Sequence, residues 1–128
     1  MSPLIAALDR ALRVAGEDIN LRRRFGEAPN ETFATVTCRA RVDRQVIGQS
    51  PAGILLTKYS LILSPTQINE AGWPGAVLAD QPDADPRIPR ENDTDDVIIR
   101  GERPRVITVC DAKVIGGELV RINLECVG

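Results

Sequence analysis

The sequence predicts a mainly β fold of the α+β kind: a small antiparallel β-barrel or sandwich of five to seven strands, an N-terminal helix, a short helix after a central strand and a long acidic loop. Three observations support this prediction. Apolar residues recur at helical spacing near the N-terminus, they alternate with polar residues in most later segments, and prolines and carboxylates interrupt the pattern over residues 74–96. A chain of 128 residues can bury a core as a single domain, 1–128, without metal or disulfide support.

Residues 1–16 are expected to form the N-terminal helix. Ser2 can cap the first free N–H groups, Pro3 suits the first helical position, and Gly16 is the expected stop. The apolar stripe of this helix consists of Leu4, Ile5, Leu8, Leu12 and Ala15. Such a stripe packs either against its own domain or on a neighbouring subunit, and the sequence leaves both open.

Residues 17–73 are expected to form the first β part and a short helix. The segments "EDINLRRR", "TVTCRARV" and "LLTKYSLIL" alternate, and the turn-rich "VDRQVIGQSPAG" between the last two is either a short edge segment or an exposed loop. A capping box of Ser64 and Gln67 begins a helix from Pro65 to about Ala71, and Gly72 ends it. The residues expected to face the core are Ile19, Leu21, Val36, Cys38, Ala40, Val42, Leu55, Thr57, Tyr59, Leu61 and Leu63.

Residues 74–96 are expected to form one long loop, poorly ordered from about residue 76 to residue 95, because its prolines and carboxylates offer little to bury. Trp73 and Pro74 form its root, where the tryptophan ring can either fix the loop or simply complete the core. The spacing of the acidic residues does not match an EF-hand calcium loop. The loop carboxylates are Asp80, Asp83, Asp85, Glu91, Asp93, Asp95 and Asp96.

Residues 97–128 are expected to form the second β part. "DVIIRG", "RPRVITVCDA" and "GELVRINLECV" are separated by turns at Gly101 and at Gly116 and Gly117. In the last of these strands, the residues expected to face inward are Val120, Ile122, Leu124 and Cys126.

The composition argues against an enzyme. The chain has no histidine, which removes the commonest general base, and it has no P-loop, nucleophile elbow or aspartic protease motif. Its three cysteines lack metal-ligand spacing and lie in alternating apolar runs, so they are expected in the core. We therefore expect no catalytic residue, no metal, no cofactor and no small-molecule substrate.

Charge and hydropathy point to no particular partner. The formal net charge is -2, and no segment reads as a signal peptide or a membrane span, so we expect a cytoplasmic protein without a membrane partner. An arginine face of Arg22, Arg23, Arg24, Arg39 and Arg41 provides candidate phosphate or subunit contacts. With four aromatic residues in all, stacking platforms for bases are scarce, and a β-barrel nucleic-acid-binding module remains the alternative interpretation.

The order of these parts resembles a family. An N-terminal helix is followed by "GEDINLRRR", "ATVTCRARV", the step "LILSPTQINEAGWP", a loop, and "NDTDDVIIRGERPRVITVCDAKVIGGELVRINLEC". Over nearly the whole chain this order resembles the small head-tail joining (stopper, head-completion) proteins of long-tailed bacteriophages, prophages and gene transfer agents. The resemblance is carried by the fold pattern, with "GGELVRI" as its clearest part, and not by a catalytic signature.

The resemblance implies a structural virion protein that forms a ring, closes the DNA channel and docks the tail. The implied partners are further copies of the chain, in a hexamer or dodecamer, together with portal or adaptor proteins, tail proteins and, transiently, packaged DNA. The implied location is the virion neck, after assembly in the bacterial host cytoplasm. The loop over residues 74–96 matches the family segment that projects into the ring lumen, so the resemblance implies a channel loop there.

Overall fold

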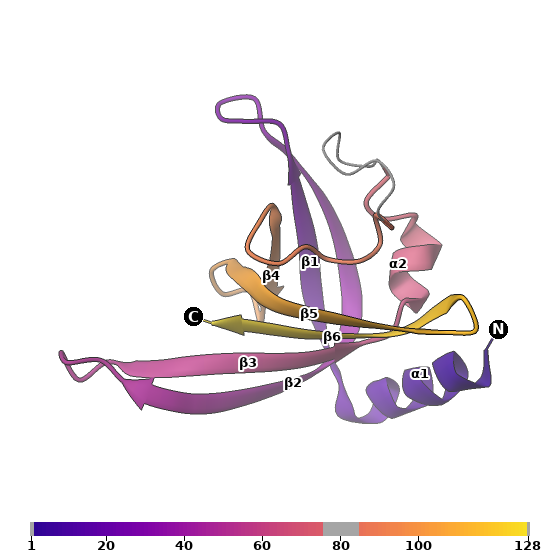
Figure 1. The fold of residues 1–128 in the computed structure, drawn as a ribbon, viewed down its shortest axis with the longest axis horizontal. Helices are drawn as coiled ribbons and strands as arrows, with labels where there is room; N and C mark the ends of the chain where they lie inside the picture. The colour runs from indigo at the N-terminus through magenta and orange to yellow at the C-terminus, as the bar shows by residue number, and fades with distance from the viewer. Residues whose placement is uncertain (1, 76–84, 128) are drawn as a thin grey trace.

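The computed structural model describes residues 2–75 and 85–127, and these form six antiparallel strands and two helices (Figure 1). The predicted mainly β fold, with one helix before the strands and a short one among them, is confirmed. Asp80 and Asp83 of the predicted channel loop lie outside the described residues. Within the described part of the chain, neither helix has the length and apolar character needed to cross a membrane. The elements are α1 (Pro3–Ala15), β1 (Glu17–Phe25), β2 (Thr32–Gln49), β3 (Leu55–Leu63), α2 (Thr66–Ala71), β4 (Asp95–Ile99), β5 (Arg105–Ile115) and β6 (Glu118–Val127).

All six strands belong to one sheet that closes on itself. The strand order is β1-β2-β3-β6-β5-β4, and the ring is completed because β4 pairs with β1. This closing pair sets Ile19 opposite Ile99 and Leu21 opposite Val97, with all four side chains buried. The closed sheet therefore holds its core on the inside, as the period-2 pattern predicts.

The core consists of the inward side chains of all six strands, together with Ile68 of α2 and Trp73. The predicted alternation holds along β1, the first half of β2, most of β3 and β6. Leu55 is the exception: it is exposed although it was expected in the core. Leu55 is the first residue of β3 and lies outside the closed part of the sheet, where the only partner strand is β2.

The segment "VDRQVIGQSPAG" also differs from expectation. Residues 41–49 continue β2, which is 18 residues long, and only the four residues 50–53 form the turn. Gly53, with φ of 83°, adopts the left-handed conformation that the turn requires. The segment is therefore one side of a long hairpin.

Both helices lie at one end of the sheet, as Figure 1 shows. The Ser2 side chain accepts a hydrogen bond from the Leu4 N–H, as predicted for a cap of α1. The predicted capping box of α2 is wrong: the Ser64 hydroxyl accepts from the Thr66 N–H, whereas the Gln67 side-chain oxygen has no hydrogen-bond partner. Gly72 ends α2 in the left-handed conformation, as predicted.

Candidate functional site

A buried ion pair joins the beginning of β4 to the end of β1. Arg23 and Asp95 are each 1% exposed, and the guanidinium donates two hydrogen bonds to the carboxylate, Nε to Oδ1 at 2.8 Å and Nη2 to Oδ2 at 2.7 Å. Both side chains point inward because each continues the buried alternation of its strand. A fully buried, bidentate pair of this kind fixes the register of the two strands.

The same arginine also holds the segment before β4. Arg23 Nη1 donates to the Pro86 carbonyl at 2.7 Å and Nη2 to the Ile88 carbonyl at 3.1 Å, while Asp95 Oδ2 accepts from the Arg90 N–H at 2.7 Å. Ile88 packs against the core. The Arg23–Asp95 pair therefore fastens residues 86–90 to the sheet, and further along the Asn92 N–H donates to the Ile107 carbonyl at 2.7 Å.

Trp73, at the start of the chain segment that follows α2, packs against the same ion pair. Its ring is buried, the guanidinium carbon of Arg23 lies 4.8 Å from the ring centroid, and the indole N–H donates to the Ala34 carbonyl at 2.8 Å. Pro74 follows it, half-buried, beside the same cluster. Trp73 thus contributes both to the core and to the loop root.

The predicted channel loop departs from expectation in its last part. Asp95 and Asp96 belong to β4, and Asp96 forms a bidentate pair with Arg22 at 2.9 Å for both hydrogen bonds. Their register partners on β1 are the two arginines themselves. The prediction that these two carboxylates belong to a solvated loop is wrong, because pairing between β1 and β4 places them against opposite charges.

The remaining described carboxylates of that loop also have partners. Asp85 forms two hydrogen bonds with the Arg87 guanidinium, which hold the pKa of its carboxyl below the ordinary value. Asp93 pairs with Arg90 at 2.7 Å, and Glu91 accepts a hydrogen bond from the Cys110 N–H at 3.1 Å. Residues 85–96 therefore do not present the free acidic surface that their composition suggests.

The arginine face is likewise engaged within the chain. Arg22 stacks over the Phe33 ring, 4.1 Å from its centroid, in addition to its pairing with Asp96, while Arg24 lies 4.0 Å from a carboxylate oxygen of Glu31. Arg41 lies 3.7 Å from Asp43. Of the five arginines, Arg23 lies in the core, while the other four lie on the outside of β1 and β2 beside carboxylates of the same chain.

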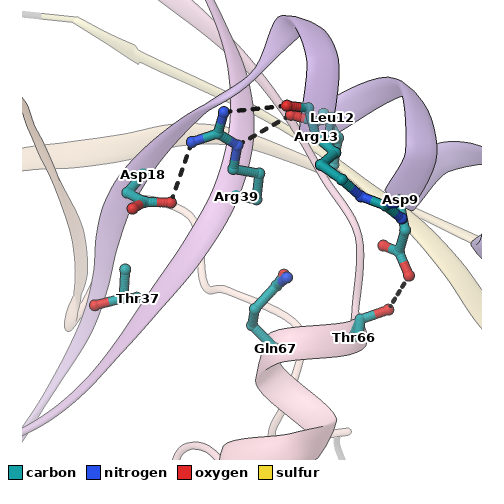
Figure 2. Close-up of a pocket in the computed structure, with 8 residues that line it drawn as sticks. All are labelled: Asp9, Leu12, Arg13, Asp18, Thr37, Arg39, Thr66 and Gln67. Carbon is teal, nitrogen blue, oxygen red and sulfur yellow. Dashed lines mark hydrogen bonds and ion pairs between the residues drawn. The ribbon is translucent and has the colours of Figure 1, made fainter.

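A polar pocket of about 340 Å³ lies between α1, α2 and the first two strands (Figure 2). Arg39 occupies one wall, where it donates to the Leu12 carbonyl at 3.0 Å and lies 3.4 Å from Asp18, so this cation holds the C-terminal end of α1. Asp9 of α1 accepts from the Thr66 hydroxyl of α2 at 2.7 Å. Most polar groups of the pocket thus serve to attach α1 to the domain. The lining residues are Asp9, Leu12, Arg13, Asp18, Thr37, Arg39, Thr66 and Gln67.

The thiols of the three cysteines are poor nucleophiles at neutral pH, because they stay protonated. Burial raises the pKa of the Cys38 thiol to about 12 and those of Cys110 and Cys126 to about 11. No group of three potential metal ligands comes together among the residues that the structure describes. The predicted core position holds for Cys38 and Cys126, while Cys110 is half-buried.

Among the residues that the structure describes, the largest group of neighbouring exposed aliphatic side chains lies on an arm, defined here as residues 45–57 at the far end of the β2–β3 hairpin. In this segment β2 and β3 pair only with each other, because the pairing of β2 with β1 ends at Ala40 and that of β3 with β6 ends at Lys58. The arm extends away from the closed part of the sheet (Figure 1). Its exposed large apolar side chains are Val46 (50%), Ile47 (49%), Ile54 (65%), Leu55 (53%) and Leu56 (44%).

The charge distribution along the sequence marks the arm, whereas the hydrophobic periodicity does not. Residues 45–57 include no charged side chain, although 27% of the whole chain is charged. An exposed loop would ordinarily be polar, so five large aliphatic residues without any charge indicate a surface that is covered by something else.

Comparison with known proteins adds no assignment: no protein-family model matches the chain, and no curated protein is similar to it in sequence.

Proposed function

We propose that this protein is a structural subunit of a bacteriophage or prophage neck, a head-tail joining protein that associates with further copies of itself into a ring. In this role it closes the DNA channel under the portal or adaptor and provides the surface on which the tail docks. The order of the sequence elements, ending in "GGELVRI", supports the family, and the closed sheet of six antiparallel strands is compatible with it.

The observation that carries the proposal is the apolar arm. A two-stranded ribbon is at best marginally stable in water by itself, and this one exposes aliphatic side chains from both of its strands. Fully burying one such side chain is worth about 1.5–3 kcal/mol, so covering the exposed half of five of them is worth about 4–7 kcal/mol before the costs of association. A protein surface is the natural cover for such an arm.

The remaining features suit a building block. The Arg23–Asp95 pair and Trp73 fasten the segment before β4 to the sheet, and Arg39 fastens α1 to it. Because its loop segment and its N-terminal helix are held against the sheet, the subunit can present its arm at a fixed place in an assembly.

Deletion of the gene tests the proposed function directly. Particles made without the chain should be heads, either DNA-filled or leaking, without attached tails, as seen by negative-stain electron microscopy. Supplying the wild-type chain, or the control variant Val109→Asp on β5, should restore tailed particles. Normal tailed particles from the deletion strain would overturn the proposal.

A further inference from the structure

Helix α1 has a second apolar face that none of the residues described in the structure covers. Ile5 and Leu12 are buried against the sheet, while Leu4, Ala7, Ala11 and Val14 are all exposed. These four residues are spaced by three, four and three positions, so they form one straight stripe along the outside of the helix. The charged residues Asp9, Arg10 and Arg13 occupy the remaining face, so the apolar surface of α1 is wider than contact with its own sheet requires.

This outer stripe and the arm match in size and character. The outer stripe extends over about 15 Å, from ten steps of 1.5 Å between Leu4 and Val14, and the arm strand Gln45–Gln49 over about 13 Å, from four steps of 3.3 Å. Neither surface contains a charged side chain. The two central alanines leave room for the branched side chains of a facing hairpin.

The two surfaces cannot meet within one molecule. Figure 1 shows the tip of the β2–β3 hairpin and helix α1 towards opposite ends of the longest axis of the molecule. We infer that the arm of one copy packs on the outer stripe of α1 in the next copy. This inference rests on the self-association in the proposed function and names the two surfaces that carry it.

Contact between two different surfaces has a consequence for symmetry. Each copy uses its arm on one neighbour and its helix on the other, so the contact is heterologous, and repetition gives a ring when the rotation closes. Arm and outer stripe together offer on the order of 400 Å² of apolar surface, about half of the apolar share of a standard interface. A single contact is therefore weak, and closure, which gives every copy two contacts, makes the assembly persist.

The test uses two variants that each lose one surface. In the arm variant, Ile47→Asp with Leu55→Asp places negative charge on the arm. In the helix variant, Ala7→Glu with Ala11→Glu places negative charge on the outer stripe. All four positions are exposed, and the helix substitutions keep good helix formers. Val109→Asp, an exposed apolar position on β5 outside both surfaces, is the matched control.

The readout is amide chemical shifts, which detect weak contacts in a chain of this size. Each variant alone should lose the concentration-dependent shifts of the wild-type chain, and the control should keep them. When ¹⁵N-labelled arm variant is mixed with unlabelled helix variant, shifts should return at residues 4–14 only. In the reverse labelling they should return at residues 45–57 only.

Other outcomes overturn the inference in distinguishable ways. Concentration-dependent shifts that persist in the helix variant would show that the arm binds another surface, which sinks the α1 contact and leaves the proposed ring in place. A wild-type chain without such shifts at millimolar concentration would remove the contact altogether. If the chemical shifts return in the mixed samples but the deletion strain makes normal tailed particles, the contact between copies is supported and the neck function is contradicted.

Discussion

Replacing Asp95 by asparagine should cost far more stability than the same replacement one residue along the strand. Asp95→Asn leaves the guanidinium of Arg23, which is 1% exposed, without its counter-charge, and breaking a buried pair in this way costs about 3–5 kcal/mol. A domain of this size has about 5–15 kcal/mol of stability in total. The variant should therefore lose about a fifth or more of its stability, with a fall in Tm of roughly 10–20 °C.

Asp96→Asn is the matched control. It breaks a bidentate pair of similar geometry, with Arg22, but both of these side chains remain in contact with water, so a loss of at most about 1 kcal/mol is expected. Urea unfolding can be followed by the fluorescence of Trp73, the only tryptophan, whose ring lies beside Arg23. Equal and small losses for the two variants would refute the role assigned to the buried pair.

A double replacement separates stability from loop attachment. Arg23→Met with Asp95→Leu removes both charges, and buried pairs replaced by apolar side chains are often neutral in stability. The Pro86 and Ile88 carbonyls and the Arg90 N–H would nevertheless lose their partners. Hydrogen exchange at Arg90 should accelerate while the strands remain protected. Unchanged exchange at that amide would contradict the fastening of this segment by the ion pair.

Three further predictions concern the core thiols, the tryptophan and nucleic acid. Trp73→Phe should cost about 1–2 kcal/mol in urea unfolding followed by circular dichroism, since it removes the hydrogen bond to the Ala34 carbonyl, and no loss would contradict that role. Labelling of the thiols of Cys38, Cys110 and Cys126 at pH 8 should be slow in the folded protein and fast in urea. The free energy of unfolding should fall as pH rises from about 9 towards the folded pKa values of about 11 to 12, because the thiols of the unfolded chain ionise first. Duplex DNA should bind weakly even at low salt because the arginine face is paired with carboxylates, and an affinity that falls steeply with salt would revive the nucleic-acid interpretation.

Much of the fold could be predicted because local patterns determine it. Alternation places Ile19 and Leu21 in the core, and extending the same period by two residues places Arg23 there as well. By composition, however, Arg23 belongs with Arg22 and Arg24 to a basic cluster expected on the surface. Its partner Asp95 could not be identified in this way, because the pairing of β1 with β4 joins residues 72 positions apart.

The arm was missed for a different reason. Gly48, Pro51 and Gly53 are typical turn residues, so the segment that contains them is expected to be a short edge segment or a loop despite its aliphatic side chains. In the structure, a register shift between Val46 and Gly48 accommodates the first glycine within β2, so the strand continues past it. Isolated glycine therefore marked an irregularity in the strand and not its end.

Cryo-electron microscopy of the neck in intact tailed particles, from the strain that encodes this chain, tests the central claim most directly. The account predicts a ring of copies of this fold between head and tail, each with its β2–β3 arm against a neighbouring subunit. Tailed particles whose necks contain no copy of the chain would contradict it.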